Sequence, residues 1–168
     1  MKKYFFSLIM LFFISQTVFG QSADEIMTKA KIEAKSGKKN IMLIFHASWC
    51  GWCKKFDKAM DASLVKSFFD ANYVRLHFTV KESEKNKDLE TVGAENYLKK
   101  FAGEKSGLPF WVILDEDGKL VGSSIVNGNN LGCPADKNEV NEFITVLNKT
   151  AKVIKVPEEK IKEVFIIQ

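Results

Sequence analysis

The apolar positions of the chain predict four β-strands. An unbroken apolar run from Ile41 to Phe45 is typical of a strand that is buried on both faces of a sheet. Apolar and polar residues alternate from Tyr73 to Val80, which indicates a strand with one buried face. Two further apolar runs flank the segment 115–118, whose Asp-Gly turn predicts a hairpin. The predicted strands are residues 40–47, 73–80, 110–114 and 119–126.

Helical periodicity fills the stretches between these strands. From Asp24 to Ser36, apolar residues recur every three or four positions, and Gly37 follows as a stop signal. The predicted helices are residues 24–36, 49–62, 64–71, 94–101, 136–148 and 157–166. The charged segment 81–90 has no periodicity, so we expect a solvated loop there. The order of elements predicts one α/β domain with a mixed central sheet and helices on both faces.

The N-terminal residues have the pattern of a secretory signal peptide. A positive start, Met1-Lys2-Lys3, precedes an apolar run from Tyr4 to Ile14 that is about half as long as a membrane-spanning helix. We expect cleavage between Gly20 and Gln21, with an uncleaved anchor as the alternative. The predicted organisation is a signal peptide at 1–20, a domain at 21–150 and a C-terminal extension at 151–168.

Composition narrows the class of protein. The chain has 168 residues, 46% apolar and 27% charged, as expected of one globular domain. Without the two lysines of the signal peptide the net charge falls from +4 to +2, which does not indicate a nucleic-acid partner. The three cysteines are Cys50, Cys53 and Cys133, too few for a disulfide framework. Export would place these thiols in an oxidising compartment.

Cys50 and Cys53 lie where a buried strand leads into a helix. Residues three apart on a helix face the same way, with Cβ atoms about 5–6 Å apart, which nearly suits a disulfide. The start of a helix stabilises an anion, so the pKa of Cys50 should be lowered and its thiolate should act as the nucleophile. Cys53 would then be the resolving thiol. Gly51 leaves room for a partner, and Trp49 and Trp52 would form an apolar rim.

Other roles for a cysteine pair fit the sequence less well. A structural zinc site needs four ligands, but there is no second Cys-x-x-Cys and the histidines are His46 and His77 alone. Haem attachment needs a histidine where Lys54 stands. A structural bridge over so short a loop would add little stability. We therefore expect redox chemistry without a metal or cofactor, and these alternatives stay open.

The run from Trp49 to Lys54, Trp-Cys-Gly-Trp-Cys-Lys, resembles the active-site motif of the thioredoxin superfamily. The segment 107–110 resembles the proline loop of that family, and residues 115–119 resemble the hairpin that follows it. The resemblance covers 24–148 and implies a thioredoxin fold. It also implies that Pro109 has a cis peptide bond beside the cysteines and that the backbone of Leu108 binds substrate. A trans proline that starts a strand is the alternative.

Three positions depart from the family pattern. Ile44 stands where the family often has a buried acid, and Trp52 stands where thioredoxin itself has proline. His46 replaces a frequent aromatic residue, and it is either a proton shuttle or a packed histidine. Outside the motif, Cys133 lies in a loop before the helix at 136–148. It is either a packed residue or a third thiol that forms a mixed or alternative disulfide.

These features together predict an exported thiol–disulfide oxidoreductase of a bacterial periplasm or cell exterior. Its expected partners are protein thiols and disulfides and a membrane electron donor, and its only contact with a membrane would be through the signal peptide. The motif favours a protein disulfide reductase. A disulfide oxidase or isomerase, a peptide-binding module without catalysis and a metal-binding domain are the alternatives.

Overall fold

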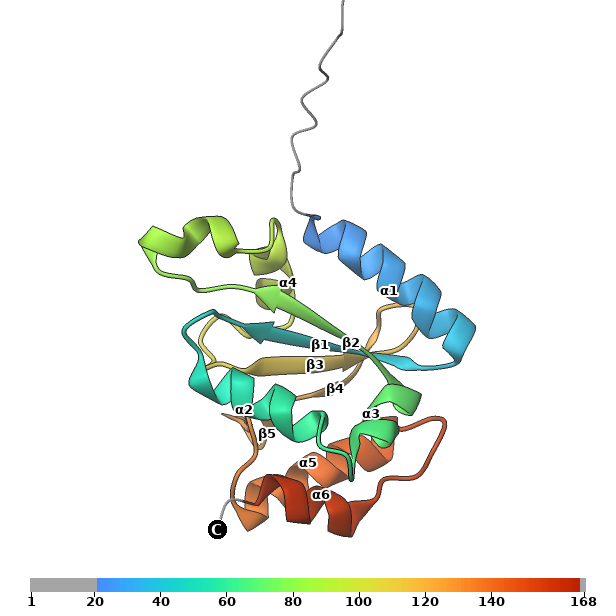
Figure 1. Cartoon of the computed structure of the whole chain (residues 1–168). Helices are drawn as coiled ribbons and strands as arrows, with labels where there is room; N and C mark the ends of the chain where they lie inside the picture. Colours follow the sequence, from blue (N-terminus) through green and yellow to red (C-terminus); the bar gives the residue numbers. More distant parts are fainter. Residues whose placement is uncertain (1–20, 167–168) are drawn as a thin grey trace, which may run out of the picture.

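The computed structural model describes residues 21–166, so the predicted signal peptide lies outside the described part. A four-stranded sheet in the order β2-β1-β3-β4 forms the centre of the molecule (Figure 1). Its strands are β1 (Asn40–His46), β2 (Tyr73–Thr79), β3 (Phe110–Leu114) and β4 (Leu120–Ser123). Strand β1 pairs with β2 in parallel and with β3 in antiparallel orientation. The sheet is therefore mixed, as the sequence predicts.

Helices cover both faces of this sheet. The helices are α1 (Ala23–Gly37), α2 (Gly51–Met60), α3 (Lys66–Asn72), the 3₁₀ helix η1 (Glu84–Leu89), α4 (Ala94–Lys100), α5 (Lys137–Thr150) and α6 (Glu158–Phe165). Figure 1 shows α1 and α4 above the sheet and α2, α3, α5 and α6 below it. Two apolar clusters, one on each face, match this division. The predicted α/β class with flanking helices is confirmed.

Strand β1 separates the two apolar clusters. Ile41, Leu43 and Phe45 belong to the cluster under α1 and α4, whereas Met42 and Ile44 belong to the other. All five side chains are buried, because this strand has a neighbour on each side and a helical layer on each face.

No helix in residues 21–166 is long and apolar enough to span a membrane.

The second strand of the predicted hairpin is shorter than expected. Ser124 interrupts it: this fully buried residue donates its N–H to the carbonyl of Trp111 and accepts the Trp111 N–H on its hydroxyl. The chain then leaves the sheet and forms a separate small hairpin of β5 (Ile125–Val126) and β6 (Asn129–Asn130). The prediction of one continuous strand from 119 to 126 is therefore wrong, and the hairpin β5–β6 lies near the cysteines.

The segment after α5 packs into the same core as the rest of the domain. Ile161 and Phe165 of α6 are 0% and 2% exposed and lie in the apolar cluster below the sheet. The buried amide of Asn72 accepts the backbone N–H groups of Lys152, Val153 and Ile154 on its oxygen. Residues 151–166 are thus held to α3 by hydrogen bonds and to the core by apolar contacts.

Candidate active site

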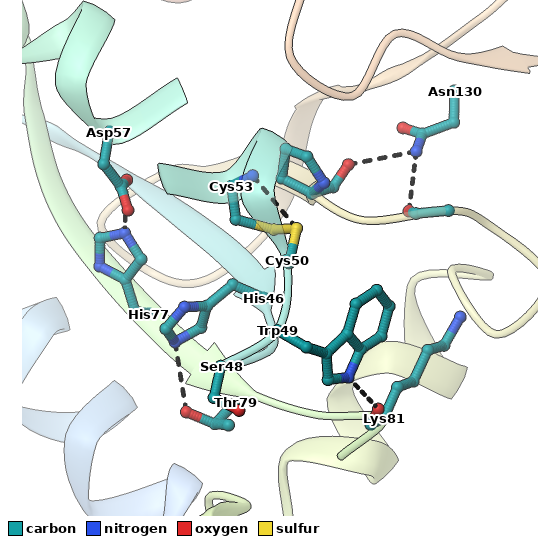
Figure 2. Close-up of a disulfide and its surroundings, with 12 residues drawn as sticks. His46, Ser48, Trp49, Cys50, Cys53, Asp57, His77, Thr79, Lys81 and Asn130 are labelled. Carbon is teal, nitrogen blue, oxygen red and sulfur yellow. Dashed lines mark hydrogen bonds and ion pairs between the residues drawn. A yellow bond between two sulfur atoms is a disulfide. The ribbon is translucent and has the colours of Figure 1, made fainter. Parts of the chain in front are cut away.

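Cys50 and Cys53 form a disulfide at the start of α2, with their Cα atoms 5.3 Å apart. Cys50 is the N-cap of the helix and Cys53 lies in its first turn. The N–H of Cys53 points at Cys50 Sγ at 3.1 Å (Figure 2). Phe56 and Met60 anchor the same face of α2 in the core. The predicted bridge is present, and the helix start supplies an N–H donor to the sulfur that is expected to react.

The two cysteines are almost completely covered in this oxidised state. Cys50 is 3% exposed and Cys53 is 2% exposed, and they form a small apolar cluster with Ala47 and Leu108. A Cβ atom added at Gly51 would meet nothing within 4 Å, so the surface above the bridge is open. A partner can therefore approach the helix start closely, but it has little sulfur surface to contact.

The proline loop lies against the cysteine pair. The peptide bond between Leu108 and Pro109 is cis, which confirms the expectation from the sequence. Pairing of Phe45 with Phe110 places this loop beside the end of β1, from which the cysteine motif follows. No hydrogen bond within residues 21–166 uses the backbone N–H or carbonyl of Leu108. Both groups are therefore available to an extended peptide.

Asn130 fixes the proline loop and is a site residue that the sequence analysis missed. Its side-chain amide donates to the carbonyls of Gly107 at 2.9 Å and Pro109 at 3.2 Å (Figure 2). The small hairpin β5–β6 supplies this residue because the chain leaves the sheet at Ser124. An asparagine in a turn-rich segment carries no sequence signal for such a contact.

The two tryptophans of the motif are exposed on either side of Cys50. Trp49 is 60% exposed and donates its indole N–H to the carbonyl of Lys81 at 3.0 Å. Trp52 is 47% exposed, with the Lys55 ammonium 4.2 Å from its ring centroid. A groove of about 600 Å³ begins at Trp52 and is lined also by Leu108, Asn130, Cys133 and Glu139. Of the two predicted rim residues, Trp52 borders this open groove, and Trp49 lies outside its lining.

Two histidines lie below the helix start, on the face of the sheet that carries α2. The rings of His46 and His77 are 5.2 Å apart, and His77 Nε2 is 2.8 Å from the Asp57 carboxylate (Figure 2). His46 Nε2 is 3.2 Å from the Thr79 hydroxyl. Burial, and then the neighbouring His77, lower the pKa of His46. His46 is therefore neutral at pH 7 and able to accept a proton.

Glu82 is a second site residue that the sequence analysis missed. Its side chain is buried, and its carboxylate accepts the backbone N–H and the hydroxyl of Ser48, two residues before Cys50. The segment 81–90 is mostly solvated, as expected, since η1 buries none of its residues. The expectation of a plain loop is wrong, because η1 spans 84–89 and Glu82 is buried. One buried acid in a run of charged residues has no periodic pattern that would identify it.

Cys133 lies in the same groove as Trp52 and Leu108 but is not bonded to another cysteine. It is half-buried, and this burial raises the pKa of its thiol to about 11. The preceding carbonyl, that of Gly132, accepts the indole N–H of Trp111 at 2.8 Å, which fixes the loop. Within the part of the chain that the structure describes, no three His, Cys, Asp or Glu side chains are grouped as a metal site.

The disulfide at a helix start, the adjacent cis proline and the mixed sheet define a thiol–disulfide oxidoreductase with a thioredoxin fold. Residues 25–116, more than half of the chain, match the family model described as Thioredoxin-like. The chain belongs to this thioredoxin-like family. No curated protein sequence matches it.

Among solved structures with low sequence identity to this chain, one supports the fold and two are more weakly similar. A disulphide isomerase from Xylella fastidiosa Temecula1 is 20% identical with a TM-score of 0.50, over 64% of this chain and 78% of that one. A protein titled DsbH oxidoreductase is 23% identical over 77% of this chain and 83% of that one, with a TM-score of 0.43. Tryparedoxin I from Leishmania major is 20% identical over 52% of this chain and 69% of that one, with a TM-score of 0.40. At these identities the first likeness shows the fold alone.

Proposed function

We propose that this oxidoreductase is an exported protein disulfide reductase that acts through Cys50 and Cys53. The observation that carries the proposal is the position of Cys50, which caps α2 and receives the Cys53 N–H on its sulfur. In the reduced protein this N–H and the helix dipole stabilise a Cys50 thiolate. Cys53, one turn inside the helix and buried, is the thiol that closes the ring.

The reaction is a pair of thiol–disulfide exchanges. The Cys50 thiolate attacks one sulfur of a substrate disulfide, so that a mixed disulfide forms and the other substrate sulfur leaves as a thiolate. The Cys53 thiolate then attacks Cys50 Sγ, which closes the Cys50–Cys53 bond and releases the second substrate thiol. Two electrons pass to the substrate, and a dithiol donor, which we place in the membrane, returns them to the pair.

His46 is the group that we propose to accept the proton of Cys53 before the second exchange. The family's acidic position is occupied by the buried apolar Ile44, which cannot take a proton. His46 follows it on the same face of β1 and is neutral at pH 7. The carboxylates of Asp57 and Glu82 favour the charged imidazole that results, whereas His77 opposes it. We expect the proton to pass from the thiol to the ring through a bridging water molecule.

The substrate that we propose is an extended peptide segment next to a disulfide. The exposed rings of Trp49 and Trp52 supply apolar contact, and the unpaired backbone of Leu108 supplies two hydrogen bonds. Gly51, between the cysteines, leaves the approach open. This arrangement suits a flexible or unfolded protein better than a small, compact thiol.

The reduction potential of the Cys50–Cys53 pair tests the direction of the reaction. Residues 21–168 carrying Cys133→Ser are equilibrated against a graded dithiol couple, and the two redox forms are quantified by mass. We expect a value near that of thioredoxin, about −270 mV. A value near −120 mV would instead identify a disulfide oxidase, and an intermediate value near −180 mV an isomerase.

One further variant and one mass measurement separate this proposal from its alternatives. Cys50→Ser should abolish reduction of a peptide disulfide, whereas a peptide-binding module with this substitution would still bind its peptide.

Export is tested by the N-terminal mass of the protein recovered from the periplasm or medium of an expressing bacterium. We expect that mass to begin at Gln21, and full-length protein held in the membrane would show an uncleaved anchor.

A further inference from the structure

We propose that Lys81 and Glu82 form a brace that holds the cysteine loop at a fixed distance from the proline loop and so positions both for substrate. This inference rests on the proposed function, because it concerns how that site binds its peptide. The cysteine loop, residues 46–50, and the segment 104–109, which leads into the proline loop, are distant in the sequence. Lys81 and Glu82 are adjacent residues that bond to both.

The brace holds the cysteine loop through two residues. Glu82 is 7% exposed, and its carboxylate accepts both the backbone N–H and the hydroxyl of Ser48, the latter at 2.8 Å. The carbonyl of Lys81 accepts the indole N–H of Trp49 at 3.0 Å (Figure 2). Ser48 and Trp49 immediately precede Cys50, so their position determines where α2 and its sulfur begin.

The side chain of Lys81 holds the other loop. Its ammonium group donates to the carbonyls of Glu104 at 2.9 Å and Ser106 at 2.7 Å, directly before the proline loop. Lys81 has a left-handed backbone conformation with φ of 55°. A non-glycine residue rarely adopts this conformation, and here it lets the carbonyl and the side chain reach different loops.

The brace is itself fixed at both ends. The N–H of Val80 donates to the carbonyl of His46 at 2.8 Å, which extends the pairing of β1 and β2. The N–H of Glu82 donates to the Glu90 carboxylate at 2.9 Å, and Lys87 donates to the same oxygen. The brace is thereby held against Glu90, the residue that ends the 3₁₀ helix η1. The charged segment 81–90 gains a definite role from these contacts.

The brace should affect substrate binding but not the chemistry of the sulfurs. The Cys53 N–H and the helix start, which stabilise the Cys50 thiolate, belong to α2 and do not touch Lys81. A peptide that pairs with Leu108 and packs on Trp49 contacts both loops at once. Loss of the brace lets these loops move independently, so the peptide must order them when it binds.

The test compares Lys81→Met in the full chain with Lys85→Met, a control at an exposed lysine of the same segment. For a peptide disulfide substrate, we expect Lys81→Met to raise KM about five- to tenfold with kcat changed less than about twofold. The reduction potential should stay at the wild-type value. Lys81→Arg, which keeps a charged donor, should restore most of the loss, and Lys85→Met should behave as wild type.

Hydrogen exchange provides a readout that does not depend on activity. We expect faster exchange at residues 46–50 and at 104–109 together in Lys81→Met, and the same in Glu82→Gln if the first variant does not fold. An unchanged KM or unchanged exchange in the variant would overturn the brace. Absence of a reversible Cys50–Cys53 couple in the wild-type protein would instead overturn the proposed function, while the exchange result would still test the brace.

Discussion

The three cysteines show how strongly the surroundings of one residue determine its chemistry. Cys50 caps a helix and faces the Cys53 N–H, which favours a thiolate. Cys133 lies in the neighbouring groove, where burial raises its thiol pKa to about 11 from an ordinary value of 9.0. Cys50 and Cys133 are therefore expected to differ widely in reactivity.

The first residue-level prediction concerns alkylation of the reduced protein. At pH 8 the raised pKa leaves Cys133 about a hundredfold less thiolate than an unperturbed thiol would have, so it should react last with iodoacetamide. Cys50 should react first. Tryptic mass mapping of a time course checks this order, and the denatured protein, in which the three rates converge, is the control. Fast labelling of Cys133 in the folded protein would contradict the prediction.

The hypothesis that Cys133 forms a mixed or alternative disulfide stays a prediction. A thiol with a raised pKa attacks disulfides slowly. Once Cys133 is part of a mixed disulfide, however, another thiolate can still attack its sulfur. Mass mapping of the air-oxidised protein decides the matter. A Cys50–Cys53 bridge with Cys133 always free would end the hypothesis.

The second residue-level prediction concerns pH. Because burial lowers the pKa of His46 below its unfolded value of about 6.5, the unfolded chain binds more protons between these two values. The free energy of unfolding should therefore fall as the pH drops from 7 to 5.5. Thermal unfolding of His46→Asn should show a smaller fall over that range. Parallel curves for wild type and variant would contradict the assignment.

At the level of elements, local signals predicted most of the secondary structure. The apolar run of β1, the alternation in β2 and the helical periodicity of α1 each depend on neighbours in the sequence, and each is confirmed. The break at Ser124 was missed because its cause is a pair of hydrogen bonds to Trp111 on another strand. Glu82 was missed for the same physical reason, since its partner Ser48 is 34 residues away.

An element-level prediction concerns how α3 holds the segment after α5. Asn72 is 0% exposed, and its amide bonds to backbone groups at both 68 and 152–154. Replacing it by alanine leaves several backbone groups without partners, so Asn72→Ala should lower the free energy of unfolding by about 3 kcal/mol. Urea denaturation measures this. Asn148→Ala removes an exposed amide that bonds one carboxylate and serves as the control; an equal effect of both would contradict the prediction.

At the level of the whole molecule, the site is assembled where separate parts of the chain meet at one end of the sheet. Pairing of β1 with β3 brings the cysteine loop beside the cis proline, and Asn130 and Lys81 fix the loops around them. The sequence motif identified the cysteines and Pro109 because the family resemblance contains them. It could not identify Asn130 or Lys81, because their partners are backbone carbonyls, which any sequence supplies.

The near-complete burial of the oxidised bridge also has a consequence for the molecules that reduce it. Cys50 and Cys53 present almost no surface to solvent, and Leu108 lies against them. A small free thiol makes few contacts beyond the sulfur that it attacks, whereas a protein donor with a matching surface also contacts the residues around the bridge. We therefore expect a protein dithiol with a matching surface to reduce this bridge faster than small free thiols do.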